Sequence, residues 1–279
     1  MKQVPSLVVI GHVAQDHIGQ HIRLGGAASF AAQAAACLGV KTGVVTVAPE
    51  AHPLLQEIKN HSLIDLHCAP SQTITTFALD YSGSIRKVTL LKQAPNIMPS
   101  DIPERFCNRP VSYIAPVIGE CGKEVIEHLK SEVTIVGAQG WLRQAGTKGQ
   151  IEPALMQDAR IVPPNISAIV CSELDHPDSE DIAQMWATKI DVVALTRGAK
   201  GITLFHKQVR YDLPATAVER EIDPTGAGDV FGVVLGLCLA QGNWVQESAR
   251  IAMDAAAAVV ENFGLGTLPQ KFSGKFSTK

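Results

Sequence analysis

The sequence predicts an α/β fold: a doubly wound, mostly parallel sheet with helices on both faces and a small added β unit. Three observations lead to this fold class. Short apolar runs typical of buried strands alternate with helical segments, a pattern that favours parallel strands joined by crossover helices. A Thr-, Ile- and Phe-rich hairpin pattern at residues 73–91 supplies the small β unit. The 279 residues have room for one large α/β domain or two small ones, and we expect a single domain over residues 1–279.

The predicted elements follow from these patterns in chain order. Strands are expected at residues 6–10, 41–47, 111–115, 133–136, 168–171 and 191–196. Helices are expected at residues 27–38, 119–130, 178–189, from 229 to 240, and 243–262. Gly39 is the expected C-cap of the first helix and Asn243 the expected N-cap of the last.

Composition narrows the class of protein. Apolar residues make up 46% and charged residues 18% of the chain, as in a globular protein with a substantial core. A net charge of −3 without a basic run favours neither nucleic acid nor a membrane surface as a partner. The six cysteines are scattered, the N-terminus lacks a signal-peptide pattern, and the apolar run 230–240 is too short to span a bilayer. We therefore expect a cytoplasmic protein.

One stretch indicates chemistry. Within residues 222–231, we expect an extended segment up to Pro224 and a turn through Gly226 and Gly228. An apolar helix should follow, with Asp229 in its first turn. Glycines allow close approach of a ligand, and the Gly226, Ala227 and Gly228 amides are predicted to be unpaired and able to bind an anion. Asp229 has an alternative role, because a carboxylate in a first turn complements the helix dipole. Two glycines directly before an acid and a wholly apolar helix favour an active-site role over a purely structural cap.

An anion cradle beside one Asp suits transfer of a phosphoryl group to a hydroxyl. The amides would stabilise charge on the phosphoryl oxygens while Asp229 accepts the hydroxyl proton. The stretch is neither a Walker A loop, since Gly-Lys-Ser/Thr is missing, nor a Gly-x-Gly-x-x-Gly fingerprint. Its sequence, Asp-Pro-Thr-Gly-Ala-Gly-Asp-Val-Phe from Asp223 to Phe231, is similar to the Asp-Thr-x-Gly-Ala-Gly-Asp-x-Phe signature of the ribokinase-like (PfkB) sugar kinases. Pro224 departs from the usual Thr.

The resemblance implies an acceptor site. In that family an Asp at the place of Asp16, and a Gly-Gly pair at the places of Gly25 and Gly26, contact the sugar. Gln139 follows a predicted strand end and is expected to face the same crevice. A small β lid from about residues 13–23 and 72–92 would keep water away. Phe30 stands where many members have Asn, and a solvated loop position is an equal alternative for Arg143.

The resemblance also implies a site for ATP and Mg²⁺. Asp175 takes the place of the acid that orders magnesium and is expected to act through water, with Glu173 as its competitor. Asp223 and nearby backbone groups would hold a monovalent cation such as K⁺. The residues expected along the nucleotide are Ser172, Thr196, Gly198, Gly201, Thr225 and Gly264.

The histidine-rich segment near the N-terminus raises the question of a metal site, but its spacing does not favour one. The spacing of His12, Asp16, His17 and His21 fits neither a helical His pair joined to further ligands nor a zinc pattern.

The predicted function is ATP-dependent phosphorylation of a small polyol or sugar. Residues 25–29 and 138–143 look most similar to the myo-inositol kinase branch of the family. The alternatives are a nucleoside kinase, a ribose- or fructose-type sugar kinase, and a non-catalytic regulator that binds nucleotide or sugar. The choice between ATP and ADP as donor, and between a monomer and a homodimer, stays open.

Overall fold

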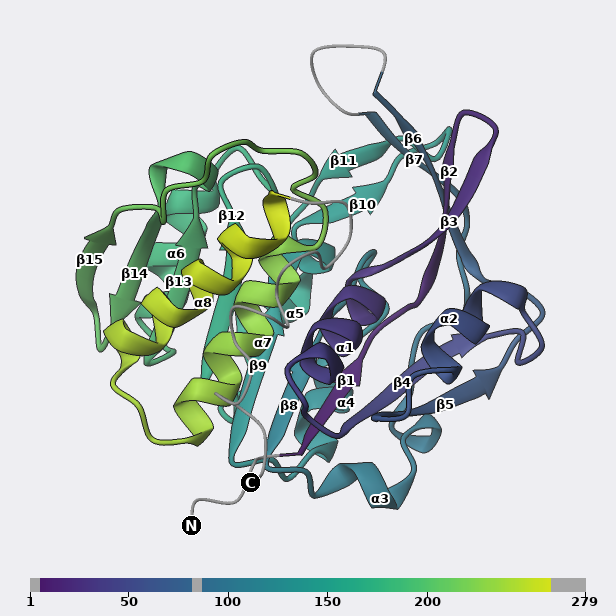
Figure 1. Ribbon diagram of the computed structural model, residues 1–279, viewed down its shortest axis with the longest axis horizontal. Coiled ribbons are helices and arrows are strands. Elements are labelled where there is room, and N and C mark those ends of the chain that lie inside the picture. The colour runs from purple at the N-terminus through teal and green to yellow at the C-terminus, as the bar shows by residue number, and fades with distance from the viewer. Residues whose placement is uncertain (1–5, 82–86, 262–279) are drawn as a thin grey trace.

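A nine-stranded sheet forms the centre of the computed structural model, which describes residues 6–81 and 87–261 (Figure 1). The strand order is β15-β14-β13-β12-β9-β8-β1-β4-β5. The strands from β13 to β5 run parallel, whereas β14 and β15 form an antiparallel edge. The strands are β1 Leu7–Ile10, β4 Thr42–Ala48, β5 Ile64–Pro70, β8 Val111–Ile114, β9 Val133–Gly137, β12 Ala168–Ser172, β13 Val192–Thr196, β14 Ile202–His206 and β15 Val209–Leu213.

Helices cover both faces of this sheet. One face carries α1 Ala27–Cys37, α2 Gln56–Lys59, α7 Ala227–Ala240 and α8 Val245–Val260. The other face carries α3 Glu104–Cys107, α4 Lys123–His128, α5 Gln157–Ile161 and α6 Ser179–Ala187. The predicted doubly wound α/β class is confirmed. The 3₁₀ turns are η1 Pro53–Leu55, η2 Pro99–Asp101, η3 Ala138–Trp141 and η4 Gly198–Lys200.

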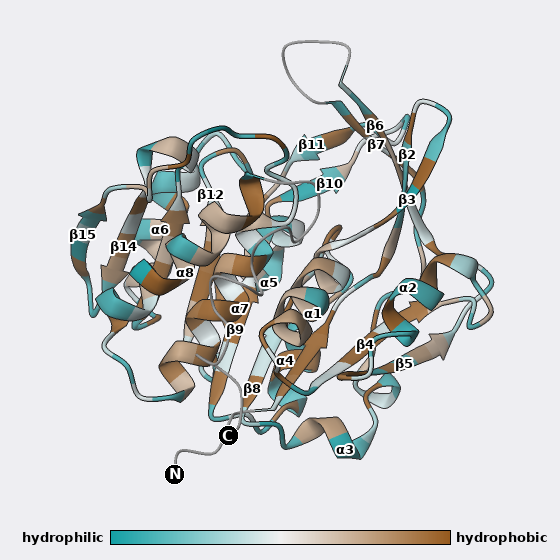
Figure 2. Cartoon of the chain, viewed as in Figure 1, coloured by the Kyte–Doolittle hydropathy of each residue, from teal (hydrophilic) through white to brown (hydrophobic). Residues whose placement is uncertain are grey.

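Two hydrophobic cores hold these layers together. Along β1, Leu7 and Val9 enter the core under α1 and α7, whereas Val8 and Ile10 enter the core on the opposite face. A strand buried on both faces has an unbroken apolar sequence, as β1 does. Figure 2 shows the central strands as mostly hydrophobic and the edge strand β15 as mostly hydrophilic.

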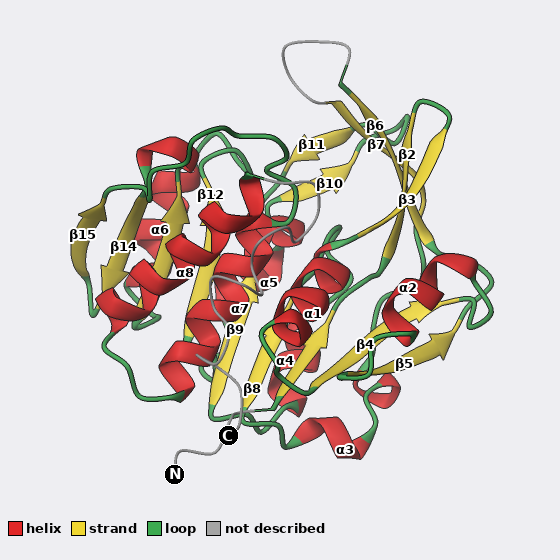
Figure 3. Ribbon diagram, viewed as in Figure 1, coloured by secondary structure: helices red, strands yellow, loops and turns green. Residues whose placement is uncertain are grey.

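A four-stranded sheet stands beyond one end of the large sheet (Figure 3). Its order is β3-β2-β6-β7, with β2 and β6 parallel and both outer pairs antiparallel. We call it the small sheet; its strands are β2 Ala14–Ile18, β3 His21–Gly25, β6 Thr75–Asp80 and β7 Lys87–Lys92. The predicted hairpin is thus confirmed as β6 and β7; residues 82–86 between these strands lie outside the described residues.

A further hairpin lies beside the small sheet. It consists of β10 Arg143–Ala145 and β11 Ile151–Pro153, which pair antiparallel. The Leu90 amide of β7 donates a hydrogen bond to the Gly149 carbonyl at 2.7 Å, which joins this hairpin to the small sheet.

Two predicted helix boundaries are wrong. The helix expected at residues 119–130 forms only as α4, because Gly119 has φ +80° and the Glu120 carboxylate accepts bonds from the Val117 and Ile118 amides. Asn243 does not cap the last helix; Trp244 precedes α8, and the Asn243 amide instead donates to the Cys238 carbonyl. Within residues 6–81 and 87–261, no helix is both long and apolar enough to cross a membrane.

Candidate active site

The predicted glycine bend lies at the start of α7. Gly226 has φ 81° and ψ −6°, a left-handed conformation that residues with a side chain rarely adopt. A Cβ on Gly226 would also lie 2.5 Å from the Phe30 ring on α1. Both facts require glycine at this position, and they place Phe30 against the bend.

The amides of the bend differ from one another. The Ala227 amide, predicted to be unpaired, donates to the Pro224 carbonyl at 3.2 Å, so this part of the prediction is corrected. The local reason is the turn that residues 224–227 form to start the helix. Gly228 is exposed, and a Cβ there would meet no atom within 4 Å. The bend is therefore open at Gly228, where a phosphoryl group has room to approach.

Asp229 occupies the first turn of α7 and is partly buried. The Tyr113 hydroxyl, from β8, donates to Asp229 Oδ1 at 3.2 Å. Burial raises the pKa of Asp229 to about 7; the Tyr113 hydrogen bond opposes this rise, repulsion from Asp175 adds to it, and attraction to Arg143 opposes it. A base with a pKa near neutrality suits proton abstraction from an alcohol.

Asp175 lies in the turn after β12. Its Oδ2 accepts a hydrogen bond from the Ser172 amide at 2.7 Å, and the Gln139 side-chain amide donates to its Oδ1 at 3.4 Å. The structure thus brings Ser172, Gln139 and Asp175 together. Gln139, which the sequence analysis places with the acceptor-binding residues, contacts the carboxylate predicted for magnesium. The competing acid, Glu173, faces Arg197 at 3.5 Å and Lys200 at 3.2 Å. Asp175 is the carboxylate whose charge acts on Asp229.

The residues present fit a magnesium ion that is bound mainly by water and substrate phosphates, as in phosphoryl-transfer enzymes. In the part of the chain that the structure describes, no three His, Cys, Asp or Glu side chains group into a metal site. Mg²⁺ is commonly held by one or two carboxylates together with water and substrate phosphates. Asp175 can provide such a carboxylate.

Asp223 has a cationic neighbour from the small sheet. Arg23, on β3, lies 3.6 Å from the Asp223 carboxylate, with side chains 35% and 18% exposed, respectively. The Thr225 amide donates to Asp223 Oδ1 at 3.0 Å. A guanidinium therefore stands beside the carboxylate that the sequence assigns to a monovalent cation, and Asp223 links the small sheet to the glycine bend.

The loop between β13 and β14 is a tight turn. The Thr196 hydroxyl donates to the Cys171 carbonyl at 3.2 Å. Gly198 and Gly201 have φ 54° and 93°, and a Cβ on Gly201 would lie 2.1 Å from the Leu213 carbonyl oxygen. The turn alone explains Gly201, whereas Gly198 has open space around it. Gly264 lies outside the described residues.

Asp16 is placed by the strand pair β2 and β3. It is 7% exposed, and a Cβ on Gly25 would lie 2.2 Å from its Oδ2. Gly25 is therefore what leaves room for the carboxylate. Gly26, with φ 90°, begins α1, and a Cβ there would lie 2.4 Å from the His12 carbonyl oxygen. The His12 ring nitrogens bond Thr75 Oγ1 at 2.8 Å and the Pro95 carbonyl at 3.0 Å.

Two residues of this region were missed or undervalued. The Arg143 Nε donates to the Val117 carbonyl at 2.6 Å, and its guanidinium carbon lies 5.5 Å from the centre of the Phe77 ring, so it is not a solvated loop residue. Tyr113 was not predicted at all. The signal available for it was a tyrosine inside an apolar strand, because a buried hydroxyl needs a hydrogen-bond partner.

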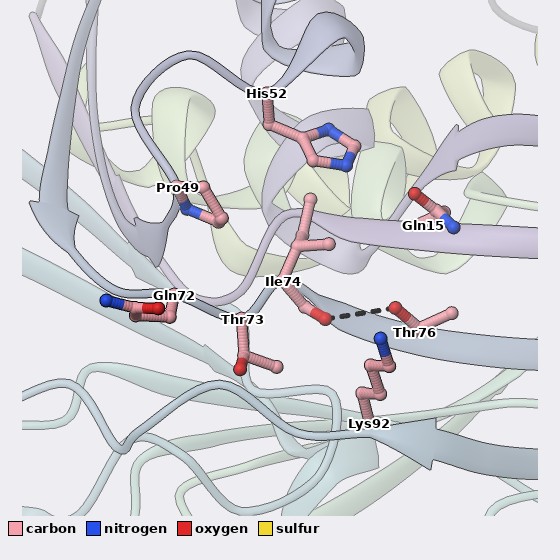
Figure 4. Close-up of a pocket in the computed structure, with 8 residues that line it drawn as sticks. All are labelled: Gln15, Pro49, His52, Gln72, Thr73, Ile74, Thr76 and Lys92. Atoms are coloured by element: carbon pink, nitrogen blue, oxygen red, sulfur yellow. Dashed lines mark hydrogen bonds between the residues drawn. The ribbon is translucent and has the colours of Figure 1, made fainter.

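A cavity of about 210 Å³ lies at the base of the small sheet (Figure 4). It contains none of the predicted site residues. Gln15 contributes to it, whereas Asp16 is the next residue of β2 and so projects to the opposite face of that strand. The cavity is lined by Gln15, Pro49, His52, Gln72, Thr73, Ile74, Thr76 and Lys92.

The doubly wound sheet, the small sheet beside it and the carboxylate at the open start of α7 define a ribokinase-like phosphotransferase with an alcohol group as acceptor. The pfkB family carbohydrate kinase model matches residues 7–271. The chain belongs to this family. ATP is a phosphoryl donor in this family, as in the complex of an Arabidopsis thaliana ribokinase with ribose and ATP, and Mg²⁺ is generally required.

Two relatives resemble the chain over most of its length. A cytidine kinase of Thermococcus kodakarensis is 27% identical over 274 residues, covering 92% of this chain and 97% of the relative. Part of the bifunctional protein HldE of Actinobacillus pleuropneumoniae is 26% identical over 237 residues, and the match spans 47% of that longer protein.

Solved structures show the same fold. A pyrophosphate-dependent kinase of the ribokinase family, complexed with a pyrophosphate analogue and myo-inositol, superimposes with a TM-score of 0.81 at 17% identity, covering 95% of this chain and 99% of the other. A nucleoside kinase of Burkholderia thailandensis in complex with inosine gives 0.71 at 18% identity and covers 97% of both chains. The protein is therefore a sugar or nucleoside kinase of the ribokinase family.

Proposed function

We propose that the protein transfers the γ-phosphoryl group of ATP to a hydroxyl of a small polyol or sugar, with myo-inositol as the first candidate. The observation that carries the proposal is the start of α7. A left-handed Gly226 and an open Gly228 stand directly before Asp229, whose pKa is raised to about 7 by burial. An anion-binding bend beside a base whose pKa is close to neutral pH is the arrangement that phosphoryl transfer to an alcohol needs.

In the proposed reaction, Asp229 takes the proton of the acceptor hydroxyl. The hydroxyl oxygen forms a bond to the γ-phosphorus while the bond from that phosphorus to the β–γ bridging oxygen breaks, and ADP leaves with the electron pair. The helix dipole and the amides of Gly226 and Gly228 would stabilise the negative charge on the phosphoryl oxygens. Magnesium, held in part through Asp175, would neutralise phosphate charge.

The donor would lie along the residues predicted for it, and the small sheet would serve as a lid. Ser172 ends β12 and Thr196 ends β13, at the carboxyl edge of the parallel strands where ligands bind in open α/β sheets. Gly198 belongs to the turn that follows β13, and Thr225 lies directly before the bend that starts α7. The Arg23–Asp223 ion pair supports the lid assignment, because it joins the small sheet to the glycine bend.

Asp16, Gly25 and Gly26 are the proposed acceptor-binding residues. A carboxylate can accept hydrogen bonds from two hydroxyls of a polyol, and Gly25 leaves space for it. Resemblance at residues 25–29 and the structural neighbour bound to myo-inositol support an inositol acceptor. The second candidate is a nucleoside, which the cytidine kinase relative supports because its similarity extends over nearly the whole of both chains.

An ADP-release assay with myo-inositol, ribose, fructose and cytidine tests the proposal. We expect Mg²⁺-dependent turnover with one of these acceptors, and highest with myo-inositol. A parallel assay with pyrophosphate as donor, followed by phosphate release, tests ATP as the donor. No turnover with either donor, together with acceptor-dependent thermal stabilisation, would instead favour a non-catalytic binding protein. Six cysteines, none of them joined in a disulfide, support our placement of the protein in a reducing cytoplasm.

A further inference from the structure

Tyr113 lies beneath Asp229 in the core of the molecule. It belongs to β8 and is 1% exposed. Its hydroxyl donates to Asp229 Oδ1 at 3.2 Å, across 116 positions of sequence. A phenol buried this deeply needs a hydrogen-bond partner, and the carboxylate of the proposed base is that partner.

Two glycines make the space that the tyrosine occupies. A Cβ on Gly137, at the end of the neighbouring strand β9, would lie 2.5 Å from the Tyr113 hydroxyl oxygen. A Cβ on Gly232, three residues after Asp229 on α7, would lie 2.5 Å from the edge of the ring. The ring is therefore confined between a strand and the helix that carries the base, and its hydroxyl has little freedom to move.

We propose that Tyr113 is a positioning residue for the base: its hydroxyl holds Asp229 Oδ1, fixes the orientation of the carboxylate, and leaves Oδ2 to take the acceptor proton. The inference rests on the proposed role of Asp229 in phosphoryl transfer. A fixed carboxylate avoids the loss of side-chain freedom that would otherwise accompany the reaction, which is how positioning groups increase turnover.

The hydrogen bond also acts on the charge of the base. The groups that face Asp229 are Tyr113 on β8, Asp175 after β12 and Arg143 on β10. A hydrogen bond donated to a carboxylate favours its charged form. Tyr113 therefore opposes burial and repulsion from Asp175, both of which favour the protonated and inactive acid.

Tyr113→Phe tests the proposal, since it keeps the ring between the two glycines and removes only the hydroxyl. At pH 7 we expect kcat to fall about 5- to 30-fold, with KM for donor and acceptor changed less than about twofold. The acid limb of the kcat–pH profile should move to higher pH by about one unit. Tyr211→Phe, on the edge strand β15, is the matched control and should leave all of these unchanged.

A second measurement does not depend on turnover. Carbon NMR of the protein labelled in its aspartate carboxyl groups gives the Asp229 titration without substrate or magnesium, assigned by its loss in Asp229→Asn. We expect the same upward shift in Tyr113→Phe. If the wild-type protein phosphorylates no acceptor yet the titration shifts, the proposed function fails while the contact between the two side chains stands. An unshifted titration, or a fall in kcat that is equal at every pH, overturns the positioning role.

Gly137→Ala sharpens the test, because its methyl group would meet the hydroxyl at 2.5 Å and the ring carbon behind it at 3.1 Å. The variant should lower kcat in the wild-type protein and have a much smaller effect in the Tyr113→Phe background. Melting temperatures of all variants separate this coupling from loss of fold. Additive effects of the two substitutions would contradict the proposal.

Discussion

Asp16 and Asp229 are two carboxylates held in different ways. Asp16 lies on the small sheet, where a missing side chain at Gly25 admits it. Asp229 lies in the first turn of α7, a helix that covers the large sheet, and a buried tyrosine from β8 contacts it. The backbone of a strand pair thus places the proposed binding carboxylate, whereas side chains of the core place the proposed reacting one. Because the supports are separate, substitutions at the two sites should affect binding and turnover separately.

The largest expected effect is that of Asp229→Asn. The amide keeps the shape of the side chain and can accept the Tyr113 hydrogen bond, but it cannot take a proton. We expect kcat to fall on the order of 10²–10⁴-fold, with acceptor affinity little changed. Steady-state kinetics and calorimetric titration measure the two effects. Asp181→Asn, an exposed position of α6, is the control, and near-normal turnover in Asp229→Asn would rule out the base.

Asp16→Asn should show the opposite division. Losing a charge-assisted hydrogen bond to a hydroxyl costs about 1.5–3 kcal/mol, so acceptor KM should rise about 10- to 100-fold. The kcat at saturating acceptor should change much less. A variant with reduced kcat and unchanged acceptor KM would show that Asp16 does not hold the acceptor.

The pH dependence of turnover follows from the Asp229 pKa of about 7. Only the ionised carboxylate can act as a base, so kcat should fall about tenfold per pH unit below this value and level off above it. The profile is measured at saturating donor and acceptor. An acid limb near pH 4, the range of an ordinary carboxyl group, would show that the carboxylate is fully hydrated during the reaction.

Asp229→Asn should also stabilise the fold above neutrality. The Asp229 pKa is higher in the folded protein than in the unfolded chain, so the unfolded chain loses this proton at lower pH. The free energy of unfolding therefore falls as pH rises from about 4 to about 7, and it stays low above pH 7. Since Asp229 is partly exposed, we expect about 1–2 kcal/mol, or a few degrees in Tm, at pH 8. The two proteins should melt alike near pH 4. Equal melting temperatures at pH 8 would contradict the burial of the charge.

The smallest expected effect is that of Arg23→Gln, which removes the ion pair with Asp223. Partly exposed pairs contribute about 0.2–1 kcal/mol, so donor KM should rise less than about fivefold. High salt should reduce the difference between variant and wild type. A large, salt-independent loss of kcat would instead give Arg23 a direct role at the phosphoryl group.

Local sequence predicted those parts of the molecule that local physics determines. The glycine bend, the β6–β7 hairpin and the alternation of strands and helices each depend on neighbouring residues. The failed helix start at Gly119 depends on Glu120, whose carboxylate accepts a hydrogen bond from the His12 amide, 108 positions away, as well as from the Val117 amide. The Tyr113–Asp229 contact joins residues 116 positions apart. A tyrosine inside an apolar strand indicates that its hydroxyl has a partner, but no pattern along the chain indicates which residue that is.

The packing of α7 has a consequence for altering the substrate. A Cβ on Gly232 or Gly236 would collide with the Tyr113 ring or with Ile135 at 2.5 and 2.8 Å, so the helix lies too close to β8 and β9 for larger residues. Redesign along this helix would displace its first turn together with the base. Libraries that seek new acceptors are therefore best confined to the strands of the small sheet, where substitutions can reshape recognition without moving the chemistry.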